Sequence, residues 1–187
     1  MAVQHARHFR FTVEQYQRLA HEGYIAPDAR VELIDGEIVE MSPIGERHNA
    51  VVDGITELLF ERLGATVSLR IQGSVRLTEE IAPHPDISVM RRREDRYASG
   101  LPRPKDILLI IEVADSSLVF DRDEKALRYA RYGIVEYWLV DLTHNVVLVH
   151  TDPTPEGYRS IEIRRRDDSW NPRSLPSLTV SGKDIFG

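Results

Sequence analysis

Two stretches decide the fold: Pro83-His84-Pro85-Asp86-Ile87-Ser88-Val89 and Ile107-Leu108-Leu109-Ile110-Ile111-Glu112-Val113. Each is an apolar run that carries one carboxylate. The second run has apolar residues at both parities, which is typical of a strand buried on both faces in the middle of a sheet. If the runs pair antiparallel, Asp86 and Glu112 lie at the same edge of the sheet. Two ionised carboxylates placed so close repel each other, and a divalent metal ion is the usual remedy.

The segments before these runs predict helices and hairpins. Thr12 with Gln15 three residues later forms a capping box, which begins a helix that runs to about residue 22. Asp35-Gly36 is a strong hairpin turn signal between strand-like segments 31–34 and 37–41. Apolar residues at helical spacing predict a long helix over 46–63. A second hairpin is expected from strands 66–69 and 74–78 around Gln72-Gly73.

The segments after these runs predict a helix and further strands. Residues 121–132 are expected to form a helix that Gly133 ends. Strands are expected over 135–141, 146–151 and, at a sheet edge, 158–164. A buried strand, a helix and another strand in this order fit a right-handed crossover between parallel strands. The fold class is therefore α/β with a mixed sheet, and we expect the Pro-rich tail to pack on its body.

The length and composition of the chain limit the class of protein to which it can belong. A chain of 187 residues with 42% hydrophobic and 29% charged residues fits a soluble globular protein, and we expect one domain over 1–187. Cysteine is absent, which excludes disulfides and thiolate metal sites. No apolar run approaches the roughly 18 residues of a membrane span, and Met1–Arg10 lacks the apolar core of a signal peptide. We therefore expect a cytoplasmic protein with no membrane partner.

The charge pattern leaves nucleic-acid binding open. A formal net charge of -6 counts against tight nonspecific DNA binding, because phosphate contacts supply most of that affinity. Two basic clusters, Arg91-Arg92-Arg93 and Arg164-Arg165-Arg166, would either contact phosphates or be solvated charges. The loop that follows the first cluster is polar, and we expect it to be exposed and mobile. The sequence lacks a Gly-rich phosphate loop, a Ser-His-Asp elbow and a His-Glu-x-x-His motif, which removes several enzyme classes.

The carboxylate-bearing runs resemble the PD-(D/E)XK nuclease superfamily. Pro85-Asp86 matches its PD, and Glu112-Val113-Ala114 matches the second half except that alanine replaces the final lysine. The wider sequence is similar to the Uma-two type of restriction endonucleases over nearly the whole chain. The residues that carry this similarity occur in a fixed order: Glu32-Leu33-Ile34-Asp35-Gly36-Glu37, His48, Pro85-Asp86, Glu112-Val113 with Ser116-Ser117, Asp121 with Lys125, and Gly133-Ile134-Val135-Glu136-Tyr137-Trp138-Leu139-Val140-Asp141.

The resemblance implies a restriction-endonuclease-like mixed β-sheet flanked by helices and a magnesium-dependent endonuclease. Asp86 and Glu112 would bind Mg²⁺ or Mn²⁺, with the carbonyl of Val113 as a further ligand. In that branch the lysine has moved to the following helix, so Lys125 would hold the attacking water or stabilise charge on the phosphoryl oxygens. The resemblance also implies DNA as the partner, while a homodimer stays open.

Each of these residues also has a structural interpretation. Asp86 would receive backbone donors at a strand start, and Glu112 would pair with an arginine. Lys125 would be an ordinary surface lysine paired with Asp121 four residues earlier. Asp121 would cap the helix as well as orient Lys125, and the cap alone would be an adequate interpretation.

Three more polar residues are candidates. Glu32 would complete the acidic cluster from the first hairpin or simply face water. His48, in the first turns of the long helix, would contact a phosphate or metal-bound water, or be a capping or surface histidine. Gln72 would be a polar helper from the second hairpin.

Two functional alternatives remain. The chain could be an inactive nucleic-acid-binding or regulatory protein on the same fold, which Ala114 and the acidic balance favour. It could also be a different metal-dependent hydrolase that uses the same carboxylates. Metal-dependent cleavage of plasmid DNA would exclude the first alternative, and a panel of small phosphodiesters would test the second.

Overall fold

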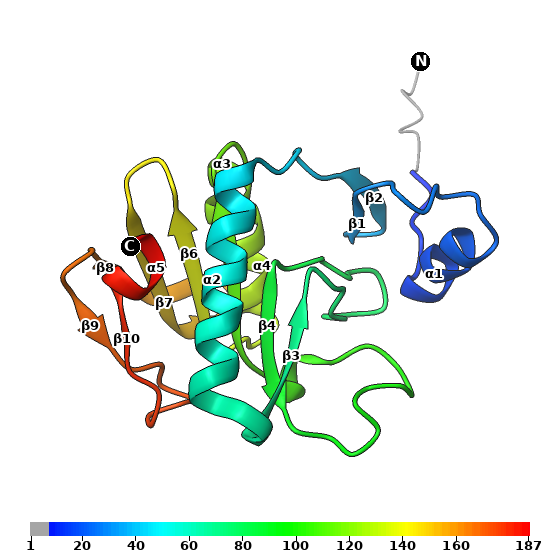
Figure 1. The fold of residues 1–187 in the computed structure, drawn as a ribbon. Helices are drawn as coiled ribbons and strands as arrows, with labels where there is room; N and C mark the ends of the chain where they lie inside the picture. The colour runs from blue at the N-terminus through cyan, green and yellow to red at the C-terminus, as the bar shows by residue number, and fades with distance from the viewer. Residues whose placement is uncertain (1–7) are drawn as a thin grey trace.

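A six-stranded mixed sheet is the centre of the computed structural model, which describes residues 8–187 (Figure 1). Its order is β3-β4-β5-β6-β7-β8, and all neighbours pair antiparallel except β5 and β6, which are parallel. The predicted mixed sheet is thus confirmed. The strands are β3 Val67–Ile71, β4 Ile87–Arg91, β5 Ile107–Ala114, β6 Glu136–Asp141, β7 Val146–Thr154 and β8 Gly157–Arg164.

Helices cover both faces of this sheet. Helix α2, Glu46–Leu63, belongs to the core cluster that holds the odd-numbered residues of β5 from Leu109 to Val113. Ile110 of β5 belongs to a second cluster with residues of α4, Ala126–Arg131. Because successive side chains of a strand point to opposite faces, α2 and α4 lie on opposite sides of β5. Glu112 therefore points toward the α4 side.

The segment before α4 is not a regular α-helix. The chain turns helical at α3, Leu118–Phe120, and continues through a π-helical turn, η3, Asp121–Lys125. The prediction that the helix begins at Asp121 is therefore wrong by one turn. Its end is confirmed, since Gly133 has a φ of 79° in the left-handed region that glycine tolerates.

The N-terminal part forms a separate layer beside the main sheet (Figure 1). Helix α1, Val13–His21, begins with the predicted capping box of Thr12 and Gln15. The predicted hairpin consists of β1, Val31–Ile34, and β2, Glu37–Glu40. An isolated bridge from Leu33 of β1 to Ala82 joins this hairpin to the segment that leads into β4.

The C-terminal part packs on the body, as predicted. It contains the short strands β9, Ser169–Trp170, and β10, Val180–Ser181, and the helix α5, Gly182–Phe186. Its buried apolar residues belong to the same core cluster as α2. These residues are Trp170, Leu175, Leu178, Val180 and Ile185.

The second predicted hairpin is wrong. Strand β3 follows a 3₁₀ turn, η1, Gly64–Thr66, and pairs with β4 instead of with residues 74–78. Residues 74–78 form no strand. Val75 N donates to Pro83 O at 3.0 Å and Leu77 N to Ile81 O at 2.9 Å, while Arg76 N donates to Pro102 O at 2.8 Å in the loop between β4 and β5. The buried strand β4 outcompetes this more polar segment as the partner of β3.

The loop between β4 and β5 is mostly exposed, as predicted. It ends in the 3₁₀ turn η2, Pro104–Asp106, and Tyr97 within it is buried. Among residues 8–187, the helices are too short or too polar to cross a membrane. The expectation about a leader at Met1–Arg10 falls mostly on residues outside those that the structure describes.

Candidate active site

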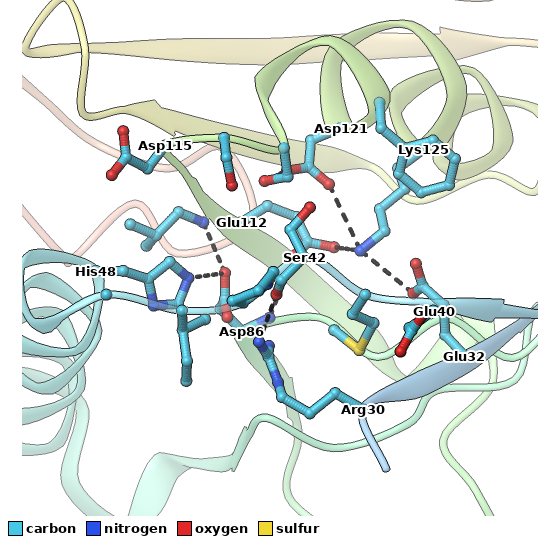
Figure 2. A pocket seen from close by; sticks show the side chains of 18 of the residues that line it. Arg30, Glu32, Glu40, Ser42, His48, Asp86, Glu112, Asp115, Asp121 and Lys125 are labelled. Carbon is cyan, nitrogen blue, oxygen red and sulfur yellow. Dashed lines mark hydrogen bonds and ion pairs between the residues drawn. The ribbon is translucent and has the colours of Figure 1, made fainter.

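A cavity of about 150 Å³ opens at the edge of the sheet where β4 begins and β5 ends (Figure 2). It lies between the first turn of α2, the hairpin strand β1 and the π-helical turn. Six predicted site residues line it, although they come from separate elements: Glu32, His48, Asp86, Glu112, Val113 and Lys125.

The register of β4 and β5 brings the two motif carboxylates together. Ile87 pairs with Ile111, so Asp86 lies beside Glu112, as the antiparallel prediction requires. The Asp86 N–H donates to Glu112 Oε2 at 3.3 Å, and the Val113 N–H donates to Asp86 Oδ2 at 2.8 Å. The backbone donors expected for Asp86 at a strand start are thus present, in addition to its place at the cavity.

His48 holds Asp86 from the other side. Its Nε2 lies 3.1 Å from Asp86 Oδ2, and both side chains are buried. An ionised carboxylate only accepts, so the imidazole donates. Helix α2 begins at Gly45 without a side-chain cap, so the interpretation of His48 as a capping or surface histidine is wrong.

Lys125 is a buried ammonium at the centre of the cluster. Its Nζ lies 3.1 Å from Glu112 Oε1, 3.3 Å from Glu32 Oε2 and 3.5 Å from Asp121 Oδ1. Its side chain is only 5% exposed. The interpretation as an ordinary surface lysine is therefore wrong, although its predicted pair with Asp121 is present.

Glu32 belongs to this cluster and does not face water. The residue is 2% exposed, and Oε2 also accepts a hydrogen bond from the backbone N–H of His84 at 3.0 Å. The contact follows from the bridge between β1 and the segment before β4, which turns the first hairpin toward the cavity.

Asp121 does not cap a helix. The helical segment already begins at Leu118, and Asp121 lies inside the π-helical turn. Its Oδ2 accepts from Ser117 Oγ at 2.5 Å, while Oδ1 faces Lys125. The carboxylate therefore orients Lys125 and not a helix terminus.

Tyr129 is a site residue that the sequence analysis missed. Its hydroxyl donates to Glu112 Oε1 at 2.8 Å, and the ring is fully buried. The spacing of four residues from Lys125 places both on one helix face, which is the signal that could have found it. Glu112 thus receives two donors from the same helical segment on one oxygen.

The buried cluster around Lys125 contains more carboxylates than cations. Among the described residues, the carboxylates of Glu32, Glu112 and Asp121 share the ammonium of Lys125, and Asp86 lies against the His48 imidazole. The four carboxylates exceed the one ammonium by three negative charges if all are ionised. Burial raises the pKa of Glu112 well above its usual range and raises that of Asp121 too, against the lowering influence of Lys125. Such a cluster favours an additional cation.

Burial alone would lower the pKa of Lys125, but the carboxylates of Glu112, Glu32 and Asp121 outweigh burial and raise it. Lys125 therefore stays protonated throughout the physiological pH range. A lysine in this state acts as a fixed positive charge and not as a proton acceptor.

Other predicted residues lie elsewhere. Gln72 is exposed and does not line the cavity. Arg91-Arg92-Arg93 follow β4 at the end opposite Asp86, and Arg164-Arg165-Arg166 follow β8, so neither cluster lines this cavity. Arg30 does line it, and its Nη1 donates to Ser42 O at 2.5 Å.

The donor set fits a hard divalent cation. Within residues 8–187, no group of three or more His, Cys, Asp or Glu side chains is spaced to hold a metal ion by itself. Mg²⁺, however, is usually bound by one or two carboxylates together with water and substrate phosphate. Asp86 and Glu112 supply two such carboxylates side by side, with the backbone of Val113 at the same cavity wall.

Comparisons with known proteins agree with this fold. A family model described as "Uma2: Putative restriction endonuclease" matches residues 13–181. A solved structure from Anabaena variabilis ATCC 29413, described as "a putative nuclease belonging to DUF820", superposes with a TM-score of 0.70 at 18% identity. The match covers 94% of this chain and 97% of that chain. No curated protein matches the sequence.

Proposed function

Because this chain belongs to the Uma2 family of restriction-endonuclease-like proteins, we propose that it is a metal-dependent endonuclease that hydrolyses phosphodiester bonds in DNA. One observation carries the proposal: in the described part of the chain, four buried carboxylates and one ammonium meet at a cavity on the sheet edge. A purely structural ion pair would have one carboxylate for each cation, whereas this cluster has four carboxylates and one ammonium.

In this proposal Asp86 and Glu112 hold Mg²⁺ or Mn²⁺, with the Val113 carbonyl as a further ligand. When bound, the ion supplies Lewis-acid chemistry toward the phosphodiester. The Val113 N–H and the His48 imidazole hold Asp86 in place, and the Tyr129 hydroxyl holds Glu112. These contacts preorganise the carboxylates, so that little reorganisation is needed when substrate binds.

Lys125 contributes a fixed positive charge. Its ammonium offsets negative charge on the phosphoryl oxygens or orients the attacking water by donating to it. Glu32 and Asp121 fix the ammonium from two sides. This arrangement replaces the lysine that is missing at Ala114, because Lys125 reaches the same carboxylate, Glu112, from the neighbouring helical segment.

Arg30 supplies a second contact for the substrate. Its guanidinium lines the cavity and bonds to the carbonyl of Ser42, a neutral acceptor. The guanidinium thus keeps its charge available for a phosphate, which it can meet with two parallel N–H donors.

Cleavage of supercoiled plasmid DNA tests the proposal. The wild-type protein should nick or linearise the plasmid with Mg²⁺ or Mn²⁺ and not with EDTA. Asp86→Asn and Glu112→Gln should each lose activity and Mn²⁺ binding by calorimetry, whereas Glu57→Gln on the exposed side of α2 should keep both. Equal cleavage by all four proteins would trace the activity to a contaminant. Cleavage of single-stranded RNA alone would reassign the substrate.

A further inference from the structure

A second cavity, of about 310 Å³, lies at the other end of the main sheet. It is formed by the loop between β4 and β5 together with Arg76. Four cationic side chains line it, Arg76, Arg93, Arg103 and Lys105, against one acidic side chain, Asp106. This composition is the reverse of the acidic cavity that holds Asp86 and Glu112.

The positive charge is concentrated in a chain that is acidic as a whole. Residues 91–106 contain six Arg and Lys against three Asp and Glu, while the whole chain has a net charge of -6. Arg76 and Arg93 are paired with nearby carboxylates. Arg103 and Lys105 are exposed, and within residues 8–187 neither side chain forms an ion pair. Like charges held close together without such partners repel one another, so a cavity that carries them favours a polyanion.

The loop that carries these charges is firmly held. The Asp95 carboxylate accepts from the Tyr97 N–H at 3.2 Å and from Ser99 Oγ at 2.7 Å, and it pairs with Arg93 at 2.7 Å. Tyr97 is buried, its hydroxyl donates to Arg91 O at 2.7 Å, and the Arg93 guanidinium lies 4.6 Å from the centre of its ring. The cationic side chains therefore project from a fixed scaffold.

The backbone of this loop is strained. Arg96 and Tyr97 have φ angles of 49° and 64°, in the left-handed region that non-glycine residues rarely adopt. Such a conformation persists only where the surroundings impose it, and it is common at binding sites. The contacts of Asp95 and the burial of Tyr97 impose it here.

From these observations we propose that this surface, through Arg103 and Lys105, binds backbone phosphates of the nucleic acid whose scissile bond occupies the acidic cavity, with Arg76 and Arg93 paired to nearby carboxylates. The inference rests on the proposed nuclease function. A polynucleotide is the partner that fits, because it brings phosphates at regular spacing to both cavities. The surface also explains how an acidic protein holds a polyanion: the attraction is supplied away from the carboxylates.

The distance between the two cavities sets the length of nucleic acid required. The surface lies at the end of β4 opposite Asp86, and Figure 1 shows this loop and α3 at opposite ends of the sheet. A strand rises about 3.3 Å per residue, so the six residues from Asp86 to Arg92 span roughly 20 Å. At about 3.4 Å per nucleotide, a duplex must extend about six base pairs from the scissile phosphate to reach the surface.

Salt-dependent binding without metal tests the surface directly. Fluorescence anisotropy would follow a labelled 24-base-pair DNA duplex in EDTA, at several salt concentrations. For Arg103→Gln/Lys105→Gln, the slope of log Kd against log salt should fall by about two, roughly one for each phosphate that is no longer neutralised. The matched control Arg131→Gln/Arg159→Gln removes two exposed arginines elsewhere and should keep the wild-type slope. Equal slopes for both variants, or no duplex binding by the wild-type protein, would overturn the surface.

Two substrates separate this inference from the nuclease proposal. A small chromogenic phosphodiester enters only the acidic cavity, so Arg103→Gln/Lys105→Gln should hydrolyse it at the wild-type rate while cleaving plasmid several-fold more slowly. A reduced salt slope in a protein that cleaves neither substrate would keep the surface and reject the nuclease. Plasmid cleavage by the wild-type protein, together with an unchanged salt slope in the variant, would keep the nuclease and reject the surface. If poly-glutamate binds as tightly as the DNA duplex and loses as much affinity in Arg103→Gln/Lys105→Gln, the surface binds acidic proteins. That result would overturn the choice of nucleic acid as the partner.

Discussion

Among single residues, Lys125 is the one on which the electrostatics of the acidic cavity depend most. Replacing it with methionine keeps the length of the side chain and removes the charge that Glu32, Glu112 and Asp121 share. Breaking a buried ion pair in this way typically costs about 3–5 kcal/mol, and losing a preorganised charge typically costs about 10²–10³ in rate. We therefore expect Lys125→Met to melt at a lower temperature and to lose cleavage.

Lys183→Met is the matched control for this prediction. Lys183 pairs with Asp167 at 3.0 Å, but both side chains are exposed, so the pair contributes little to stability. Thermal melts and plasmid cleavage should leave the control close to wild type. Should Lys125→Met melt and cleave like Lys183→Met, the buried ammonium would be neither structural nor catalytic.

The sequence best predicted the site residues that stand at positions of the family motifs. Asp86, Glu112, Lys125, Glu32 and His48 were all expected at one site, and the structure brings them together. Their roles in catalysis stay predictions. Tyr129 and Arg30 were not predicted as site residues. Periodicity shows that a residue lies on a helix face or in a strand, but it does not show which distant residue its side chain contacts.

At the scale of elements, the π-helical turn Asp121–Lys125 is the feature that sequence periodicity could not reveal. Patterns of three- and four-residue spacing describe an α-helix, and they predicted one over 121–132. Asp121 and Lys125, four residues apart within the π turn, both face the cavity, and Tyr129 continues on the same side. Single π-helical turns occur frequently at functional sites, which fits its position here.

Deleting Asp123 tests this turn. The residue is exposed and lies inside the π-helical segment, so its removal should restore α-helical pitch at little cost in packing. Asp121 and Lys125 would then stand three residues apart instead of four, which at about 100° per residue places their side chains about 60° apart around an α-helix and displaces Asp121 relative to Lys125. We expect cleavage to fall while circular dichroism shows unchanged helix content.

Asp123→Ala is the control for the deletion, because it removes the exposed pair with Arg122 and keeps the turn. It should cleave like the wild-type protein. Wild-type cleavage by the deletion variant would mean that the π-helical turn does not orient Asp121 for function.

Strand pairing shows a second limit at this scale. The buried strand β5 and its antiparallel partner β4 were predictable, because continuous apolar runs belong in the middle of a sheet. The partner of β3 was not, because Gln72-Gly73 is a good local turn that does not fold into a hairpin. Pairing between distant segments depends on how much surface is buried across the whole sheet. A short stretch of sequence does not contain that information.

For the whole molecule, one shared core cluster links the site to remote packing. Helix α2 and the C-terminal segment both belong to this cluster on one face of the main sheet, and the first turn of α2 carries His48 into the acidic cavity. The sequence predicted that the tail packs on the body. It did not predict the small β9–β10 sheet, because two-residue strands carry no periodic signal.

Trp170 of β9 allows stability and cleavage to be separated. It is 6% exposed, its ring centroid lies 5.3 Å from that of Trp138 in β6, and it does not line the acidic cavity. Truncating a buried tryptophan to alanine typically costs about 3–5 kcal/mol, because apolar burial is lost and a cavity is left behind. Trp170→Ala should therefore unfold at markedly lower urea concentration and temperature.

Cleavage by this variant should be unchanged at temperatures where it stays folded, because Trp170 does not line the acidic cavity. Trp170→Phe is the control: Nε1 has no acceptor among residues 8–187, so phenylalanine keeps ring packing and loses no hydrogen bond. The deciding measurement is the rate of plasmid cleavage divided by the concentration of folded protein. A folded Trp170→Ala protein that cleaves poorly would show that the C-terminal segment, acting through α2, positions His48 against Asp86, and the site would then depend on packing remote from the cavity.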